Sequence, residues 1–174
     1  PIYDGAALAR EHDVVVITLN YRLGALGFAQ LDAVARGGPF ASNVGLRDQL
    51  AALAWVREHA AEFGGDAGNV TVFGQSGGGA KIATLMAMPA ARGLFHRAWT
   101  MSGQQVTAAG PRAAAQRARL YMDALGVRDV EALLRLPMPT LLEALRTRDP
   151  SCVEDTSLYF GPVLAGEALP RHPF

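Results

Sequence analysis

The segment Asn69–Gly79, with the sequence NVTVFGQSGGG, decides the fold of this chain. A short apolar, β-branched run leads into a glycine-rich turn around Ser76, and the helix-forming residues 80–88 follow up to Pro89. This order predicts a strand, a sharp turn and a helix, the setting in which the pattern Gly-x-Ser-x-Gly exposes a serine hydroxyl at a sheet end. We therefore predict that Ser76 is a nucleophile and that the N–H of Gly77 is a donor to a developing oxyanion.

Glycines at both ends of this pentapeptide have a steric reason. Side chains at Gly74 and Gly78 are expected to collide within the tight turn. The alternatives are a glycine- and serine-rich loop without chemistry, and a phosphate-binding loop. The second fits poorly, because Lys81 lies inside the predicted helix and neither Gly-Lys-Ser/Thr nor Gly-x-Gly-x-x-Gly occurs there.

Two further apolar runs extend the pattern outward into an α/β fold. Residues 14–19 are apolar on both faces, which predicts a central strand, and residues 97–101 predict a third strand ending at Ser102. One helix is predicted from a cap at Ser42 or Asn43 to a stop at Gly64 and Gly65. Further helices are predicted over residues 6–11, 80–88, 113–125, 129–136 and 139–145. The tail over 160–174 is predicted to be extended. Alternating strands and helices predict a parallel sheet, followed here by a helical segment.

Composition excludes several classes of protein. Half of the 174 residues are apolar and 18% are charged, which excludes a disordered tail. Sixteen basic and sixteen acidic residues cancel, so charge gives no argument for a nucleic-acid partner. No apolar run is long enough to predict a membrane span. The single cysteine, Cys152, excludes an internal disulfide framework and a cysteine-based zinc site, and we expect neither a metal nor an organic cofactor.

The chain begins at Pro1 and its first methionine is Met86. We therefore expect that its natural N-terminus is processed or missing, which leaves cytoplasmic and secreted locations equally open. Three strands by themselves would also leave exposed sheet edges. Both observations lead us to expect that residues 1–174 are part of a larger domain.

Several blocks in a fixed order resemble one family along nearly the whole chain. They are residues 20–28 (NYRLGALGF), 43–49 (NVGLRDQ), 63–78 around Ser76, 93–98 (GLFHRA) with Ser102-Gly103, and 161–170. The blocks resemble the type-B carboxylesterases, the α/β-hydrolase group that includes the cholinesterases. Gly77 departs from the pattern, because the family usually has alanine after the nucleophile.

The resemblance implies hydrolysis of a small-molecule ester through an acyl-enzyme on Ser76, without a cofactor. It implies a partial α/β-hydrolase domain over 1–174 that lacks N-terminal and C-terminal portions, with the catalytic Glu and His beyond Phe174. It also implies that Ser102 helps to hold this Glu, and the alternative is a serine that only caps the end of a strand. Arg22 and Asp48 match family positions that form a buried ion pair.

Residues of this chain are poor candidates for the missing acid and base. None of the four histidines, His12, His59, His96 and His172, matches a catalytic position, although Asp149, Glu154 and Asp155 precede the last of them. An alternative function is a non-catalytic, cholinesterase-like interaction domain, although such relatives have commonly lost the serine. The chain by itself is also expected to be an inactive fragment. A self-contained small domain with a chance serine turn is a third alternative.

Overall fold

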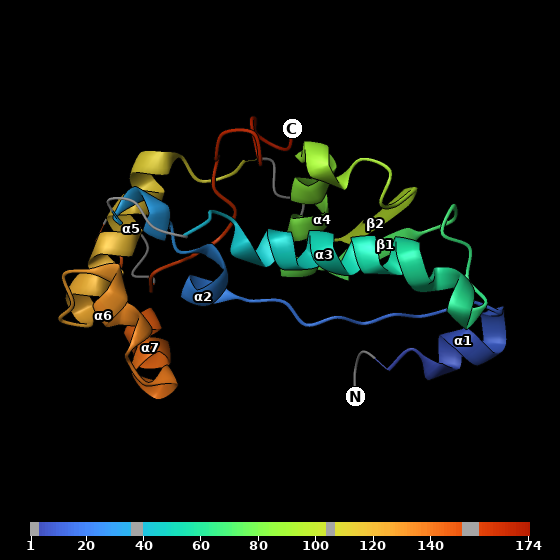
Figure 1. The fold of residues 1–174 in the computed structure, drawn as a ribbon, viewed down its shortest axis with the longest axis horizontal. Helices are drawn as coiled ribbons and strands as arrows, with labels where there is room; N and C mark the ends of the chain where they lie inside the picture. Colours follow the sequence, from blue (N-terminus) through green and yellow to red (C-terminus); the bar gives the residue numbers. More distant parts are fainter. Residues whose placement is uncertain (1–3, 36–39, 104–106, 151–156) are drawn as a thin grey trace.

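The computed structural model describes residues 4–35, 40–103, 107–150 and 157–174. The molecule is elongated, with helices from the C-terminal half of the chain gathered at one end and the two-stranded sheet and helix α1 toward the other (Figure 1). The described residues include helices α1 (Ala6–His12), α2 (Gly24–Phe28), α5 (Pro111–Ala124), α6 (Val130–Leu134) and α7 (Met138–Glu143), with 3-10 turns at Leu31–Ala33 and Ala144–Arg146. The predicted helical segment after the sheet is therefore confirmed.

The sheet is built around the predicted serine turn. Strand β1 (Thr71–Gln75) pairs in parallel with β2 (Arg97–Met101), and Thr71 lies opposite Arg97. Helix α4 (Gly77–Ala87) and a 3-10 turn at Pro89–Ala91 connect the two strands, and α4 packs on both of them. The predicted strand–helix–strand unit is thus confirmed, and α4 begins directly after Ser76.

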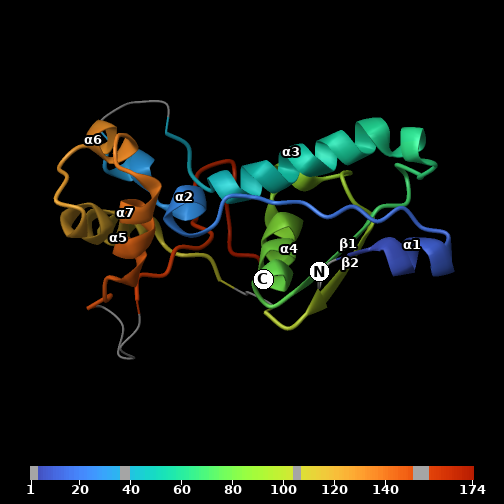
Figure 2. The same ribbon diagram turned by 90° about the horizontal axis from the view of Figure 1, so that it is seen from below.

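One predicted strand is absent from the sheet. Residues 14–23 run extended alongside helix α3 (Val44–His59) in both ribbon views (Figures 1 and 2), but among the described residues they pair with no strand. Val14, Val15, Ile17 and Leu19 are 40–49% exposed. The prediction of a central strand over 14–19 is therefore wrong for this structure, because an extended run becomes a strand only when a neighbour accepts its backbone hydrogen bonds.

Helix α3 forms where it was predicted, but its beginning is held differently. Leu46 and Leu53 are buried on one face, and the helix passes through a 3-10 turn to the predicted stop at Gly64, which has φ 78°. Asn43 precedes the helix with φ 54° and makes no side-chain cap. Its amide instead donates to the carbonyl of Val163 at 2.7 Å and accepts the N–H of Val163 at 2.8 Å. Asn43 therefore fixes the C-terminal tail rather than the helix.

The helical end of the molecule has its own buried anchor. The Tyr121 ring meets Phe160 edge-on at 5.6 Å, and its hydroxyl donates to the carbonyl of Leu141 at 2.7 Å. Asp129 caps α6 by accepting the N–H of Ala132 at 2.6 Å. These contacts join α5, α7 and the tail into one core.

The backbone at the end of β2 packs directly against the backbone of the serine turn. The N–H of Ser76 donates to the carbonyl of Met101 at 2.9 Å. An added Cβ at Gly103 would lie 1.9 Å from the carbonyl oxygen of Ser76, and one at Gly79 would lie 2.3 Å from that of Ser102. Neither approach is possible with a side chain, so glycine is required on both sides of this contact.

Arg22 and Asp48 form the expected ion pair, but it is not buried. The Arg22 guanidinium donates to Asp48 at 2.6 and 2.8 Å, and the Arg22 backbone N–H donates to the same carboxylate at 3.0 Å. The two side chains are 57% and 24% exposed. Because solvent screens the two charges, breaking this pair should lower the free energy of unfolding much less than breaking a buried pair would.

We predict that Asp48→Ala lowers the free energy of unfolding by about 1 kcal/mol, because a bidentate pair and one backbone hydrogen bond are lost. Urea unfolding at pH 7 measures this. Hydrogen bonds from Arg22 lower the pKa of the Asp48 carboxyl below its ordinary 3.8. The difference from wild type should therefore persist above pH 3.8 and shrink as the pH falls through the lowered pKa. Glu131→Ala, which removes a 3.9 Å pair on the surface, is the control and should change little.

We predict that Gly103→Ala destabilises the chain by more than about 2 kcal/mol, because the new Cβ would clash with the Ser76 carbonyl. The matched control is Gly93→Ala. Both glycines have φ near 70°, but Gly93 has open space around its Cβ position. The control should therefore cost only the backbone strain, about 1 kcal/mol. If urea unfolding showed equal losses of unfolding free energy for the two variants, the close contact between Gly103 and the Ser76 carbonyl would not be the cause.

Candidate active site

Ser76 has the backbone conformation that a sharp strand-to-helix turn requires. Its φ is 51° and its ψ is −116°, a region that non-glycine residues rarely occupy. The residue is exposed, its carbonyl accepts the N–H of Ala80 at 3.0 Å, and its hydroxyl bonds to no described residue. The contacts of β2 and α4 hold the serine in this conformation from both sides.

The first turn of α4 lies directly beside Ser76. Gly77 is the first helical residue, so its N–H has no partner within the helix, and no described residue accepts it. Free N–H groups and the helix dipole at this end favour negative charge. An added Cβ at Gly77 would meet nothing within 4 Å. The turn therefore does not require glycine at this position.

The glycines of the turn differ from the sequence prediction. A Cβ at Gly74 would lie 2.7 Å from the backbone of Gly78, so the steric prediction for Gly74 is confirmed. The prediction for Gly78 is wrong, because a Cβ there would meet no described atom within 4 Å. Sequence reasoning missed Gly79 and Gly103, whose roles depend on residues far away in the chain. The Ser102-Gly103 dipeptide at a strand end was the only signal for the second.

Ser102 lies at the same end of the sheet as Ser76. The two strands are parallel, Gln75 is opposite Met101, and each serine follows its strand. Ser102 is exposed and has φ 63°. Its carbonyl touches the position of a Gly79 Cβ, so the Ser102 turn and the nucleophile turn form one edge.

His96 lies at the opposite end of the strands. It precedes β2, and its Nδ1 accepts the N–H of Val70 at 3.2 Å. Five residues of strand separate it from the Ser102 end, roughly 16 Å. This placement argues against His96 as the base for Ser76.

The other candidates for an acid or base are also engaged elsewhere. His172 accepts the N–H of Ala108 through Nδ1 at 3.1 Å, and its neighbours Pro170 and Arg171 lie against the C-terminal end of α4. His59 pairs with Glu62 at 2.7 Å, His12 ends α1, and the carboxylate of Asp149 pairs with Arg117 at 3.0 Å. Glu154 and Asp155 lie outside the described residues. Within the described ranges, no histidine is brought to Ser76.

Lys81 does not face the glycine turn. It is only 7% exposed, and its ammonium lies 5.2 Å from the centre of the Phe28 ring. Burial lowers the pKa of this ammonium below its ordinary value. A phosphate-binding loop needs its lysine beside the glycine backbone, so this placement argues against that alternative.

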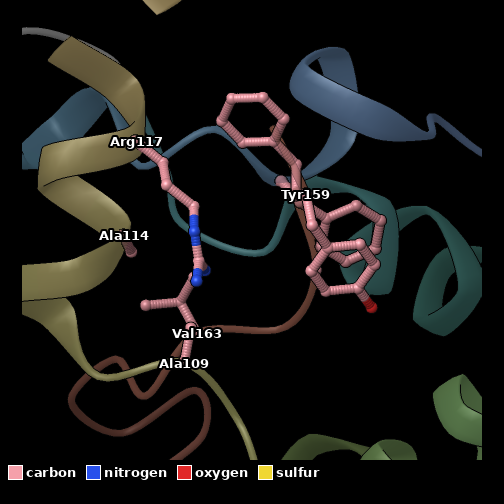
Figure 3. Close-up of a pocket in the computed structure, with 8 residues that line it drawn as sticks. Ala109, Ala114, Arg117, Tyr159 and Val163 are labelled. Carbon is pink, nitrogen blue, oxygen red and sulfur yellow. The ribbon is translucent and has the colours of Figure 1, made fainter. Parts of the chain in front are cut away.

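The structure offers no substrate-sized cavity beside Arg117. The hollow there is lined by residues that include Ala109, Ala114, Tyr159 and Val163 (Figure 3), and it has a volume of about 10 Å³. That is room for one water molecule.

In the part of the chain that the structure describes, no helix has the length and apolar character needed to cross a membrane.

Comparison with known proteins places these features in a family. A family model described as "Carboxylesterase family" matches residues 1–174. The para-nitrobenzyl esterase of Bacillus subtilis is 42% identical over 99% of this chain, and the liver carboxylesterase of Sus scrofa is 48% identical over 63% of it. The chain spans 35% of the length of the first relative and 19% of the second.

Solved structures agree with the sequence relatives. A structure named "PNB ESTERASE" superposes with a TM-score of 0.88 at 42% identity, over 99% of this chain and 37% of its own. A Geobacillus stearothermophilus carboxylesterase superposes with a TM-score of 0.85 at 41% identity, over 98% of this chain and 36% of its own. The predicted α/β-hydrolase fold class is therefore confirmed. Since the family model covers every residue, the chain belongs to the carboxylesterase family.

Proposed function

We propose that the protein is a serine hydrolase that cleaves small-molecule carboxylic esters through an acyl-enzyme on Ser76. The observation that carries the proposal is the conformation of Ser76, an exposed serine at φ 51° between a parallel strand and a helix N-terminus. A strained position of this kind persists only where the surroundings enforce it. Membership of the carboxylesterase family supports the same chemistry.

In the proposed mechanism, the Ser76 hydroxyl attacks the ester carbonyl and passes its proton to a histidine. The carbonyl oxygen becomes an oxyanion, which the N–H of Gly77 stabilises at the positive end of α4. Collapse of this intermediate expels the alcohol, which takes the proton, and leaves the acyl group on Ser76. Water then attacks the acyl group in the same way and releases the carboxylic acid. In this proposal the histidine and its Glu lie beyond Phe174, as the family resemblance implies, and Ser102 holds that Glu.

We also propose that residues 1–174 form the middle of an α/β-hydrolase domain. Phe73 and Trp99 are opposite each other in the sheet register, and they are 53% and 65% exposed on the face that α4 leaves uncovered. Val14, Val15, Ile17 and Leu19 are 40–49% exposed, and residues 14–19 pair with no strand among the described residues. Further strands and helices of a domain would cover these surfaces, which supports the proposal.

A chimera tests the proposed nucleophile. Residues 1–174 replace the matching segment of the Bacillus subtilis para-nitrobenzyl esterase, which would supply the acid and base that the resemblance implies. We predict that the chimera hydrolyses a para-nitrophenyl ester and that Ser76→Ala lowers its kcat by at least about four orders of magnitude. Ser102→Ala should lower kcat by about tenfold through the lost hydrogen bond to the Glu. Ser157→Ala, at an exposed serine, is the control and should leave kcat unchanged.

Two results would contradict this proposal. One is a Ser76→Ala chimera that keeps its activity. The other is a chimera with a cooperative melting transition that hydrolyses no ester, which would favour the non-catalytic interaction domain. The chain by itself is expected to hydrolyse the ester several orders of magnitude more slowly than the chimera, because no described histidine lies at Ser76.

We predict that Gly77→Ala keeps kcat in the chimera and raises the free energy of unfolding by about 0.5 kcal/mol. The oxyanion donor is a backbone N–H, which alanine retains, and an added Cβ meets open space. Gly79→Ala is the matched comparison within the same helix turn. Its Cβ would lie 2.3 Å from the Ser102 carbonyl, so it should lower stability by about 1–3 kcal/mol. A loss of activity in Gly77→Ala with unchanged stability would show that the turn needs glycine there.

A further inference from the structure

A second hollow lies at the end of α4 that is farthest from Ser76. It forms where the last residues of α4, the turn over residues 89–95 and the tail residues Pro170 and Arg171 meet. Its volume is about 340 Å³, within the range of small-molecule pockets. The ribbon views show the C-terminal tail returning to α4 (Figures 1 and 2). With 11 residues in α4, roughly 16 Å of helix separates this hollow from Ser76.

Apolar side chains make up part of the wall of the hollow, and polar groups make up the rest. The apolar surface comes from Met86, which is 50% exposed, and from the half-buried Phe95, whereas Leu85 and Met88 are almost fully buried. Methionine side chains are flexible and polarisable, so they adapt to alkyl chains and rings of different shapes. This part of the hollow suits the apolar portion of a small ligand.

Two arginines from distant parts of the chain complete the lining. Arg92 follows the 3-10 turn and Arg171 belongs to the tail, and both are exposed. Among the described residues neither forms an ion pair, and no acidic side chain lines the hollow. A cation near the C-terminal end of α4 would complement the helix dipole, but that effect requires no apolar hollow beside it. Guanidinium groups match carboxylates with two parallel hydrogen bonds.

We propose that this hollow binds an amphiphilic carboxylate, an organic anion whose carboxyl group pairs with Arg92 and Arg171 while its alkyl or aromatic part lies on Met86 and Phe95. The site is separate from the proposed nucleophile and its occupation requires no catalysis. If the proposed ester hydrolysis is correct, the ligand belongs to the same chemical class as the acid product.

Calorimetric titration of the whole chain with octanoate tests the proposal. We expect saturable binding to wild type. Binding should be at least about tenfold weaker in the double variant Arg92→Gln/Arg171→Gln, because each charge-assisted hydrogen bond that is lost weakens the binding of the carboxylate. Arg119→Gln, at an exposed arginine of α5 outside the hollow, is the matched control and should bind as wild type does. Octanamide, which has the same chain without the charge, should bind at least about tenfold more weakly than octanoate.

Further variants separate the outcomes. Met86→Gln, at the exposed edge, should weaken octanoate several-fold without lowering the melting temperature. Ser76→Ala should bind octanoate normally, so the result does not depend on whether the ester hydrolysis is correct. Equal affinity for octanoate and octanamide, or unchanged affinity in an arginine double variant that melts as wild type does, would overturn the proposal.

Discussion

The contact between the end of β2 and the turn at Ser76 is the constraint on which the centre of the molecule depends. The Ser76 N–H is bonded to the Met101 carbonyl, and Gly79 and Gly103 allow two backbone segments to approach closer than any side chain permits. This backbone contact holds Ser76 at a rarely populated φ and sets where α4 begins. Strain at one residue is therefore maintained by packing from residues more than 20 positions away along the chain.

Helix α4 links the features that bear on function. Its N-terminus lies beside Ser76, its middle buries Lys81 over Phe28, and its last turn forms the floor of the hollow that carries Arg92 and Arg171. It also covers one face of the two-stranded sheet, while Phe73 and Trp99 remain exposed on the other. The structure thus combines a well-packed centre with apolar surfaces of the kind that larger domains cover.

Short sequence patterns correctly predicted the elements that form because of residues close together in the chain. The strands around residues 70–73 and 97–101, the start of α4 after the serine turn and the stop of α3 at Gly64 follow from β-branched runs and glycine chemistry. The apolar run over 14–19 failed as a strand because pairing needs a neighbour, which no local pattern supplies. Asn43 failed as a cap because its amide is used by Val163, 120 residues later.

The sequence by itself determined the fold class and the serine turn as the candidate site, because these depend on residue types at fixed short spacings. The order of its blocks indicated the family, and that resemblance implied the Arg22–Asp48 pairing. Only the tertiary structure decided that this pair is exposed, that Gly79 and Gly103 rather than Gly78 are sterically required, and that the four histidines lie away from Ser76 in the described ranges. It alone brought Arg92 and Arg171 to one hollow. Each of these depends on how segments that are distant in the sequence pack together, which short sequence patterns do not specify.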